Sequence, residues 1–191
     1  MINVLIDIHM NINQDIDHIL LSKEETEEIV TRIANEINRD YAACERLVLL
    51  CILKGSAVFM GDLMKKIHLP IEIDFMKVSS YGNATVSSGT LNIIMDLKRN
   101  DIHDLDLLVI EDIIDSGRTL NMLVGYLKSK GARSVRTCTL LDKPTRRVVD
   151  FTPDYVGCEI PDEFVVGYGL DFAEKYRNLP YVGVLKKEIY E

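Results

Sequence analysis

The alternation of strand-length apolar segments with helical patterns constrains the fold of this chain more than any other feature of its sequence. Residues 47–53 are apolar without interruption, and residues 105–110 and 134–141 form two further apolar-rich segments. A strand that is buried on both faces of a sheet has this pattern. Helices are predicted between the segments, at about residues 57–67 and 118–130. The sequence therefore predicts an α/β fold, with a mostly parallel twisted sheet flanked by helices.

Weaker signals predict the remaining elements. Ser22 and Glu25 have the spacing of a capping box, so a helix is predicted to begin there and to run to about Tyr41. Residues 79–89 are rich in Ser, Gly, Asn and Thr and are predicted to form a loop. A length of 191 residues fits one domain. Further strands are predicted at about residues 2–8, 16–21, 71–79, 90–95, 155–158, 164–167 and 181–185.

Charge and composition limit the partners and the compartment. The chain has 22 basic and 30 acidic residues, and its net charge of −8 disfavours binding to nucleic acid. A small anionic substrate stays possible, because it needs only a local basic pocket. The four cysteines form no C-x-x-C pair, and we find neither a signal-peptide pattern nor an apolar run of membrane-spanning length. We therefore expect a cytoplasmic protein with no membrane or nucleic-acid partner.

Residues 111–119 carry the strongest chemical signal. Glu111 and Asp112 follow an apolar segment, where carboxylates can accept hydrogen bonds from sugar hydroxyls or face a hard cation. Residues 115–119 then form a tight turn that opens a helix, and its free N–H groups and two hydroxyls suit a phosphate. The alternative is an ordinary strand–turn–helix in which an aspartate only caps the helix. Three acids and this turn occur together in residues 111–119, which makes the alternative much weaker.

The segment 109–120 resembles the phosphoribosyl-pyrophosphate signature of the type I phosphoribosyltransferases. Its Glu-Asp-Ile-Ile-Asp-Ser-Gly part is similar to the hypoxanthine-guanine branch, and matches to that branch extend from about Leu47 to the end of the sequence. The resemblance implies the type I phosphoribosyltransferase fold within a single domain of residues 1–191, with a core at about residues 40–145. A small hood would come from about residues 1–20 and 150–191. The resemblance also implies a homodimer or homotetramer.

The resemblance further implies the donor, 5-phosphoribosyl 1-pyrophosphate, and Mg²⁺. Glu111 and Asp112 would contact the ribose hydroxyls and, with Asp171, the metal ion. Ser80 and Tyr81 would begin a flap that closes over the site. The remaining donor contacts would come from a phosphate turn of Ser116, Gly117, Arg118 and Thr119, and from Lys54, Gly55 and Arg177 at the pyrophosphate. Taken alone, Lys54 is more simply a solvated lysine in a turn.

A second set of residues would recognise the purine. By the same resemblance, Lys143 would donate to the 6-oxygen of the base, and Asp115 would accept a proton near N7. Phe164 would stack on the ring, Val165 would bond the base edge with its backbone, and Ile113 would pack below. Without the resemblance, Lys143 would be read as a surface lysine and Phe164 as a core side chain.

The resemblance implies transfer of the phosphoribosyl group to hypoxanthine or guanine, giving IMP or GMP and pyrophosphate in purine salvage. One alternative is a non-catalytic regulator that senses the donor and binds RNA or DNA. Another is an enzyme of the same fold that prefers another base, such as xanthine. Adenine is disfavoured, because Lys143 cannot accept a hydrogen bond from its amino group.

Overall fold

The structure, a computed structural model, describes residues 12–80 and 91–191, without the side chain of Ser80. Its helices are α1 (Lys23–Asp40), α2 (Ala57–Met64), α3 (Arg118–Ser129) and α4 (Lys187–Tyr190). Its strands are β1 (Ile16–Leu21), β2 (Leu47–Ile52), β3 (Ile71–Ser80), β4 (Leu91–Met95), β5 (Asp106–Ile114), β6 (Ser134–Asp142), β7 (Tyr155–Glu159), β8 (Val165–Val166) and β9 (Val182–Leu185).

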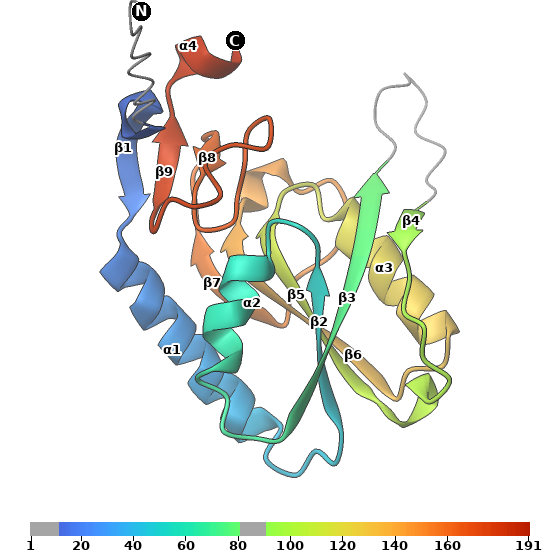
Figure 1. Ribbon diagram of the computed structural model, residues 1–191. Helices are drawn as coiled ribbons and strands as arrows, with labels where there is room; N and C mark the ends of the chain where they lie inside the picture. Colours follow the sequence, from blue (N-terminus) through green and yellow to red (C-terminus); the bar gives the residue numbers. More distant parts are fainter. Residues whose placement is uncertain (1–11, 81–90) are drawn as a thin grey trace, which may run out of the picture.

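The central sheet has the order β4-β3-β2-β5-β6-β7. Its strands pair in parallel from β3 to β7, and only the edge strand β4 runs antiparallel to its neighbour. In Figure 1, α1 and α2 lie on one face of this sheet and α3 lies on the other. The predicted fold, a mostly parallel sheet with helices on both faces, is confirmed.

Strand β2 explains why residues 47–52 are apolar without interruption. All six of its residues are buried, and successive side chains enter opposite cores. Leu47, Leu49 and Cys51 pack in a cluster with residues of α1 and α2. Val48, Leu50 and Ile52 pack in a second cluster with residues of α3.

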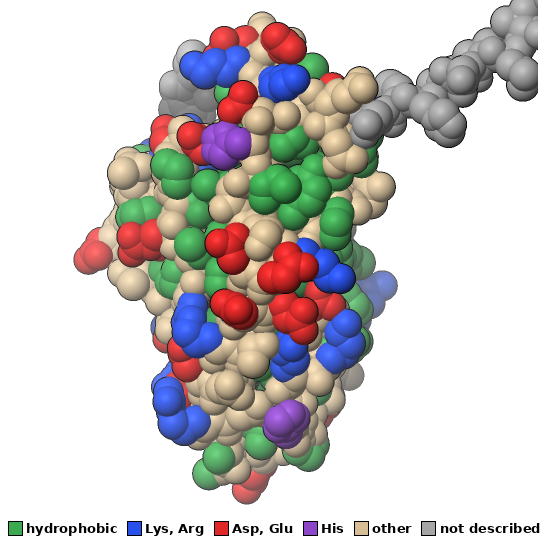
Figure 2. Space-filling model, turned by 90° about the vertical axis from the view of Figure 1, so that its left-hand side faces the viewer, with side chains coloured by type: hydrophobic (Ala, Val, Ile, Leu, Met, Phe, Trp, Pro, Cys, Tyr) green, Lys and Arg blue, Asp and Glu red, His purple; other side chains and the backbone are tan. Residues whose placement is uncertain are grey.

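Helix α1 begins where the sequence predicts. The backbone of Glu25 donates to Ser22 Oγ at 3.1 Å, and the backbone of Ser22 donates to Glu25 Oε2 at 2.8 Å, so the capping box is formed. The face of the molecule that carries α1 is shown in Figure 2, where acidic and basic side chains are interspersed. One such pair is Arg32 and Glu36, at 2.9 Å. This face therefore presents no single sign of charge to a partner.

The hood is a smaller antiparallel sheet with the order β1-β9-β8. It joins the two ends of the described chain, and Figure 1 shows it on the side toward which the parallel strands run. It has its own apolar cluster of Val166, Tyr176, Leu179 and Leu185. The hood thus covers the edge of the central sheet where ligands bind in folds of this class.

Several predicted boundaries differ from the structure. The predicted strand 105–110 is β5, which continues to Ile114 because its later residues pair with β6, for example Glu111 with Thr139. Glu111 and Asp112 therefore lie within the strand and not after it. Helix α2 ends at Met64, before the predicted residue 67, and α4 was not predicted. The predicted strand 2–8 lies outside the described residues. No helix of the described chain has both the length and the apolar character needed to cross a membrane.

Candidate active site

The parallel strands end around a polar pocket of about 340 Å³. Lys54 and Gly55, which follow β2, line one side of it, and Glu111 and Asp112 of β5 line another. Thr119, in the first turn of α3, completes the polar lining. The pocket therefore brings together residues that were predicted to share one site from two separate segments of the sequence, 54–55 and 111–119.

Glu111 and Asp112 place two carboxyl groups in poorly solvated surroundings. Burial raises the pKa of Asp112 to about 6, and it raises the pKa of Glu111 well above its usual range, with the neighbouring Asp112 adding to the effect. The backbone of Ile113 donates to Asp112 Oδ1 at 2.9 Å. Glu111 Oε2 is buried and has no hydrogen-bond partner among the described residues. An unsatisfied, buried carboxylate oxygen of this kind is suited to a cation or a hydroxyl donor.

The carboxylates do not form a complete metal site by themselves. In residues 12–80 and 91–191, no three His, Cys, Asp or Glu side chains are close enough to hold an ion together. Mg²⁺, however, commonly takes one or two carboxylates and fills its remaining positions with water and phosphate oxygens. The pair of Glu111 and Asp112 fits an ion bound in that way, whereas the third predicted ligand, Asp171, is paired with Arg177 at 2.7 Å.

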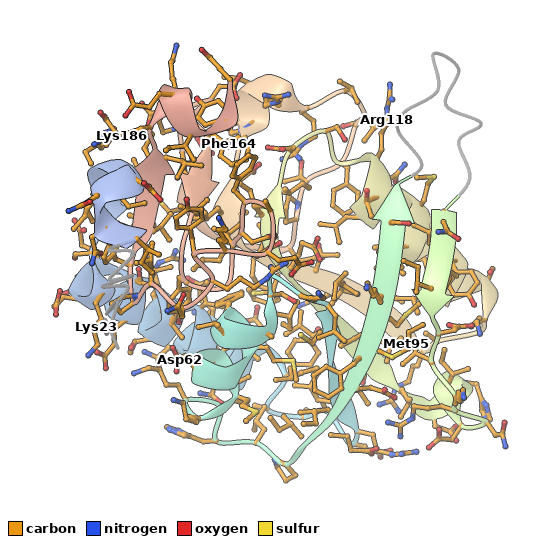
Figure 3. The ribbon with its side chains drawn as sticks, turned by 45° about the horizontal axis from the view of Figure 1, so that its top comes forward. Lys23, Asp62, Met95, Arg118, Phe164 and Lys186 are labelled. Atoms are coloured by element: carbon orange, nitrogen blue, oxygen red, sulfur yellow. The ribbon has the colours of Figure 1, made fainter. Side chains whose placement is uncertain are left out.

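The turn at residues 115–117 opens α3 toward the pocket. Gly117 has a φ of 77°, in the left-handed region, and no side chain caps the helix. The amide of Arg118 donates only a long hydrogen bond of 3.4 Å to Ser116 Oγ, so this helix end remains suited to an anion. Ser116 and Thr119 are half-buried, whereas Arg118 is exposed. Figure 3 shows Arg118 at the start of α3.

Lys54 and Gly55 form a tight loop after β2. The Leu53–Lys54 peptide bond is cis. A Cβ atom on Gly55 would lie 1.5 Å from Asp112 Oδ2, so a side chain at this position would displace the carboxylate of Asp112. Gly169, from the segment that follows β8, lies against the same loop, since its Cβ would lie 2.0 Å from the carbonyl oxygen of Gly55. This contact joins the hood to the core.

The hood segment 167–177 supplies Arg177 and Asp171. Arg177 donates to the carbonyl oxygen of Gly169 at 2.8 Å. Glu174 is paired both with Arg177, at 3.3 Å, and with Lys54, at 3.0 Å. The two cations predicted to contact pyrophosphate therefore share one carboxylate in this structure.

The predicted base-binding residues lie where the hood meets the end of β6. Lys143 is only 6% exposed, and its Nζ donates to the carbonyl oxygen of Glu163 at 2.7 Å. Asp115 Oδ1 is 3.8 Å from the same Nζ. The ring of Phe164, the next residue after Glu163, is 37% exposed (Figure 3). Val165 is buried in β8, opposite Val184 of β9, and Ile113 is half-buried in β5.

The sequence and the structure were compared with those of known proteins. The model of the phosphoribosyl transferase domain matches residues 16–173. The chain belongs to the phosphoribosyltransferase family. It is 51% identical over 177 residues to the hypoxanthine-guanine phosphoribosyltransferase of Bacillus subtilis, a match that covers 93% of this chain and 97% of that protein.

Other relatives of this phosphoribosyltransferase agree with that assignment. A solved hypoxanthine phosphoribosyltransferase of Staphylococcus aureus is 47% identical and superposes with a TM-score of 0.89, over 95% of this chain and 99% of that one. The bifunctional protein TilS/HprT of Listeria monocytogenes is 52% identical over 180 residues. The match covers 94% of this chain but only 28% of that protein.

The phosphoribosyltransferase has site residues that sequence reasoning missed. Arg147 donates to the carbonyl oxygen of Asp115 at 2.8 Å and contacts the carboxylate of Asp142, so it fixes the turn at residues 115–117 to the end of β6. Glu174 joins Lys54 to Arg177, as described above. Neither residue lies in a recognisable motif, and no sequence spacing signals these long-range contacts. Of the predicted flap residues, Tyr81 lies outside the described residues, and Ser80 ends β3 with its side chain outside them.

Proposed function

We propose that this phosphoribosyltransferase transfers the 5-phosphoribosyl group from 5-phosphoribosyl 1-pyrophosphate to hypoxanthine or guanine. The products are IMP or GMP and pyrophosphate, and the pathway is purine salvage. One observation carries the proposal. Two half-buried carboxylates adjoin an uncapped helix end, and Glu111 Oε2 is buried without a hydrogen-bond partner among the described residues. The buried Lys143 lies beside Asp115 at the same edge of the sheet.

The donor is held at both of its ends. The turn of Ser116, Gly117 and Thr119 binds the 5-phosphate through the free amides of α3 and the two hydroxyls, with Arg118 at its rim. Glu111 and Asp112 face the ribose hydroxyls. Lys54, the backbone of Gly55 and Arg177 receive the pyrophosphate, which replaces Glu174 as the partner of the two cations.

Mg²⁺ fits the carboxylate end of this site. Glu111 and Asp112 hold it together with oxygens of the donor, and Asp171 faces it from the hood. When bound, the ion neutralises charge that develops on the pyrophosphate leaving group. The buried and unpartnered Oε2 of Glu111 supports this assignment.

The base is recognised by residues of both the core and the hood. Lys143 donates to the 6-oxygen of the base, and this hydrogen bond replaces the one that Lys143 makes to the carbonyl oxygen of Glu163. Asp115 accepts a proton near N7, a role that typically contributes about 10²–10⁴-fold to a rate. Phe164 stacks on the ring, the backbone of Val165 bonds its edge and Ile113 packs below. Ser80 and Tyr81 begin the flap that keeps water from the oxocarbenium-like transition state.

The proposed enzyme works in the cytoplasm as a homodimer or homotetramer. Large apolar side chains on α2 and β3 are exposed and support self-association. They are Val58, Met64, Ile73 and Phe75. The net charge of −8 and the mixed charges of the α1 face disfavour a nucleic-acid partner.

An assay of the purified protein tests this proposal. The donor and Mg²⁺ are supplied with hypoxanthine, guanine, xanthine or adenine, and nucleotide formation is followed by absorbance. Turnover with hypoxanthine or guanine, abolished by a chelator, is the expected result. Turnover with xanthine alone would overturn the assigned substrate. Tight donor binding without turnover of any base would instead favour the regulatory sensor.

A further inference from the structure

The ring of Phe164 is held by two other aromatic residues. The ring of Tyr190, in α4, is stacked on it, with the centroids 4.7 Å apart and an angle of 22° between the planes. Phe172 meets it edge-on, at 5.6 Å and 89°. Phe164 is nevertheless 37% exposed. Tyr190 covers one face of the ring, so the exposed part of Phe164 lies elsewhere on its surface.

Tyr190 approaches Phe164 from the hood. The backbone of Leu185, in β9, donates to the carbonyl oxygen of Phe164 itself at 2.8 Å, so the strand before α4 is fixed to this residue. The backbone of Lys186 then donates to the carbonyl oxygen of Asp15 at 2.9 Å. Tyr190 and Ile189 pack on the apolar cluster of the hood. The position of Tyr190 is therefore determined by the hood sheet. Figure 3 labels Phe164 and Lys186, the residue before α4.

Phe164 lies between the hood and the core. The residue before it, Glu163, accepts a hydrogen bond from Lys143 at 2.7 Å, and Lys143 follows β6 of the central sheet. Phe164 also lines a pocket with residues of β1, β9 and α4, among them His18, Val184 and Tyr190. Tyr190 thus contacts Phe164 from the hood, whereas Lys143 contacts the preceding residue from the core.

We propose that Tyr190 is a positioning residue for the purine, which holds the Phe164 ring at the angle needed to stack on the base. The inference rests on the proposed function and adds to it a residue outside every motif of the sequence analysis. A half-exposed phenylalanine can change its rotamer, and ordering it on binding would reduce affinity. Because Tyr190 fixes the ring before the base binds, no affinity is lost in ordering it. Tyr190 therefore affects binding of the base and not binding of the donor.

The test compares Tyr190→Ala with Tyr190→Phe and with Ile189→Ala. Tyr190→Phe retains the stacked ring without the hydroxyl. Ile189→Ala shortens the neighbouring half-buried side chain of the same helix and serves as the matched control. For each variant we would measure the KM for hypoxanthine, the KM for the donor and kcat, and thermal denaturation would show that it is folded.

Tyr190→Ala is expected to raise the KM for hypoxanthine roughly two- to tenfold, the range of an aromatic pair. The KM for the donor should change by less than about twofold, a difference that a merely structural role would not produce. Tyr190→Phe should restore the wild-type KM, and Ile189→Ala should leave it unchanged. An unchanged KM for hypoxanthine, an equal loss for both substrates or a lower KM would each overturn the proposal. Failure of the proposed function would be distinguishable, since the unaltered enzyme would then form no nucleotide.

Discussion

The two sides of the site are built from different kinds of backbone. On the core side, residues 106–114 form a regular strand, and the turn after it uses one left-handed residue, the glycine Gly117. On the hood side, the segment 167–177 has four non-glycine residues with positive φ. They are Tyr168 at 50°, Ala173 at 49°, Glu174 at 64° and Tyr176 at 74°. Such conformations cost about 1–3 kcal/mol each, and they persist only where the surroundings enforce them.

Contacts from distant segments enforce the shape of the hood side. Tyr168 donates to Asp62 of α2, and Tyr176 donates to Asp15 before β1, each at 2.7 Å. Gly169 packs on the carbonyl group of Gly55. The core side, by contrast, is fixed mainly by the strand ladder, with Arg147 contacting the turn after β5. Under the proposed function we assign the chemical step to the core side, and the hood side adds Arg177 at the pyrophosphate and Phe164 and Val165 at the base.

Replacing Asp115 gives the largest expected effect and tests this division. If Asp115 accepts the purine proton, Asp115→Asn should reduce kcat by about 10²–10⁴-fold. The folded state should persist, because the Asp115 side chain is half-exposed. Steady-state kinetics with hypoxanthine and a thermal melt would measure both quantities.

Asp162→Asn is the matched control for this change. Asp162 is an exposed carboxylate two residues before Phe164, and it is paired with Arg146 at 3.0 Å. Its loss should leave kcat within about twofold, as expected for an exposed pair. Full turnover by Asp115→Asn, or an equal loss in both variants, would contradict the assignment of the chemical step to Asp115.

Replacing Lys143 should weaken recognition of the base more than that of the donor. A hydrogen bond from a charged group contributes about 1.5–3 kcal/mol, so Lys143→Ala should reduce kcat/KM for hypoxanthine and guanine roughly 10- to 100-fold. The KM for the donor should stay near its wild-type value. Arg146→Ala, which removes an exposed cation of the same region, should change neither constant. An equal loss for base and donor would show that Lys143 holds the site together without selecting the base.

The strands and the acidic turn of the core side could be predicted from local pattern, whereas Lys54 and Lys143 were assigned only by resemblance to a family. The apolar segments placed β2, β5 and β6, and the acids and the turn of residues 111–119 followed from them. Only the exact end of β5 was wrong, because the pairing of Glu111 with Thr139 is a property of the sheet and not of the segment. Local pattern was sufficient here because a parallel strand and the helix after it are continuous in sequence.

The hood side could not be predicted in that way. Asp171 and Arg177 were identified only by resemblance to a family. Glu174 bridges to Lys54, which is 120 residues away, and Tyr190 stacks on Phe164 from a helix that no signal predicted. Left-handed backbone at Tyr168, Ala173 and Tyr176 is equally invisible in a sequence, because nothing in these residue types favours it. Such features depend on contacts between distant segments.

Two glycine substitutions test whether backbone strain distinguishes the two sides. Gly169 has a φ of 102°, and its Cβ would lie 2.0 Å from a backbone oxygen, so Gly169→Ala should destabilise the fold by about 2 kcal/mol and raise the KM for the donor. Gly125 lies within α3 with nothing within 4 Å of its Cβ, so Gly125→Ala should instead stabilise the protein by about 0.5–1 kcal/mol. Denaturant unfolding would measure both. Equal effects would mean that the hood segment is not under strain.

The pH dependence of stability should differ between the two sides, and this is the smallest expected effect because each variant removes one titrating group. Burial raises the pKa of Asp112 to about 6. The contribution of this group to stability is therefore fully present below the ordinary pKa of an aspartate, and it is lost as pH rises through 6. Hydrogen bonds from Lys54 and Arg177 lower the pKa of Glu174. The contribution of Glu174 to stability is therefore present above the ordinary pKa of a glutamate, and it is lost only as pH falls below that value. In denaturant unfolding with a chelator present, Asp112→Asn should therefore gain stability relative to the wild type as pH rises from about 4 to about 6. Glu174→Gln should be less stable by a constant amount above about pH 5, with the gap closing below about pH 4. If stability changed with pH in the same way in both variants, the core carboxylates would be as well solvated as those of the hood. They would then not hold a proton that a bound cation could replace.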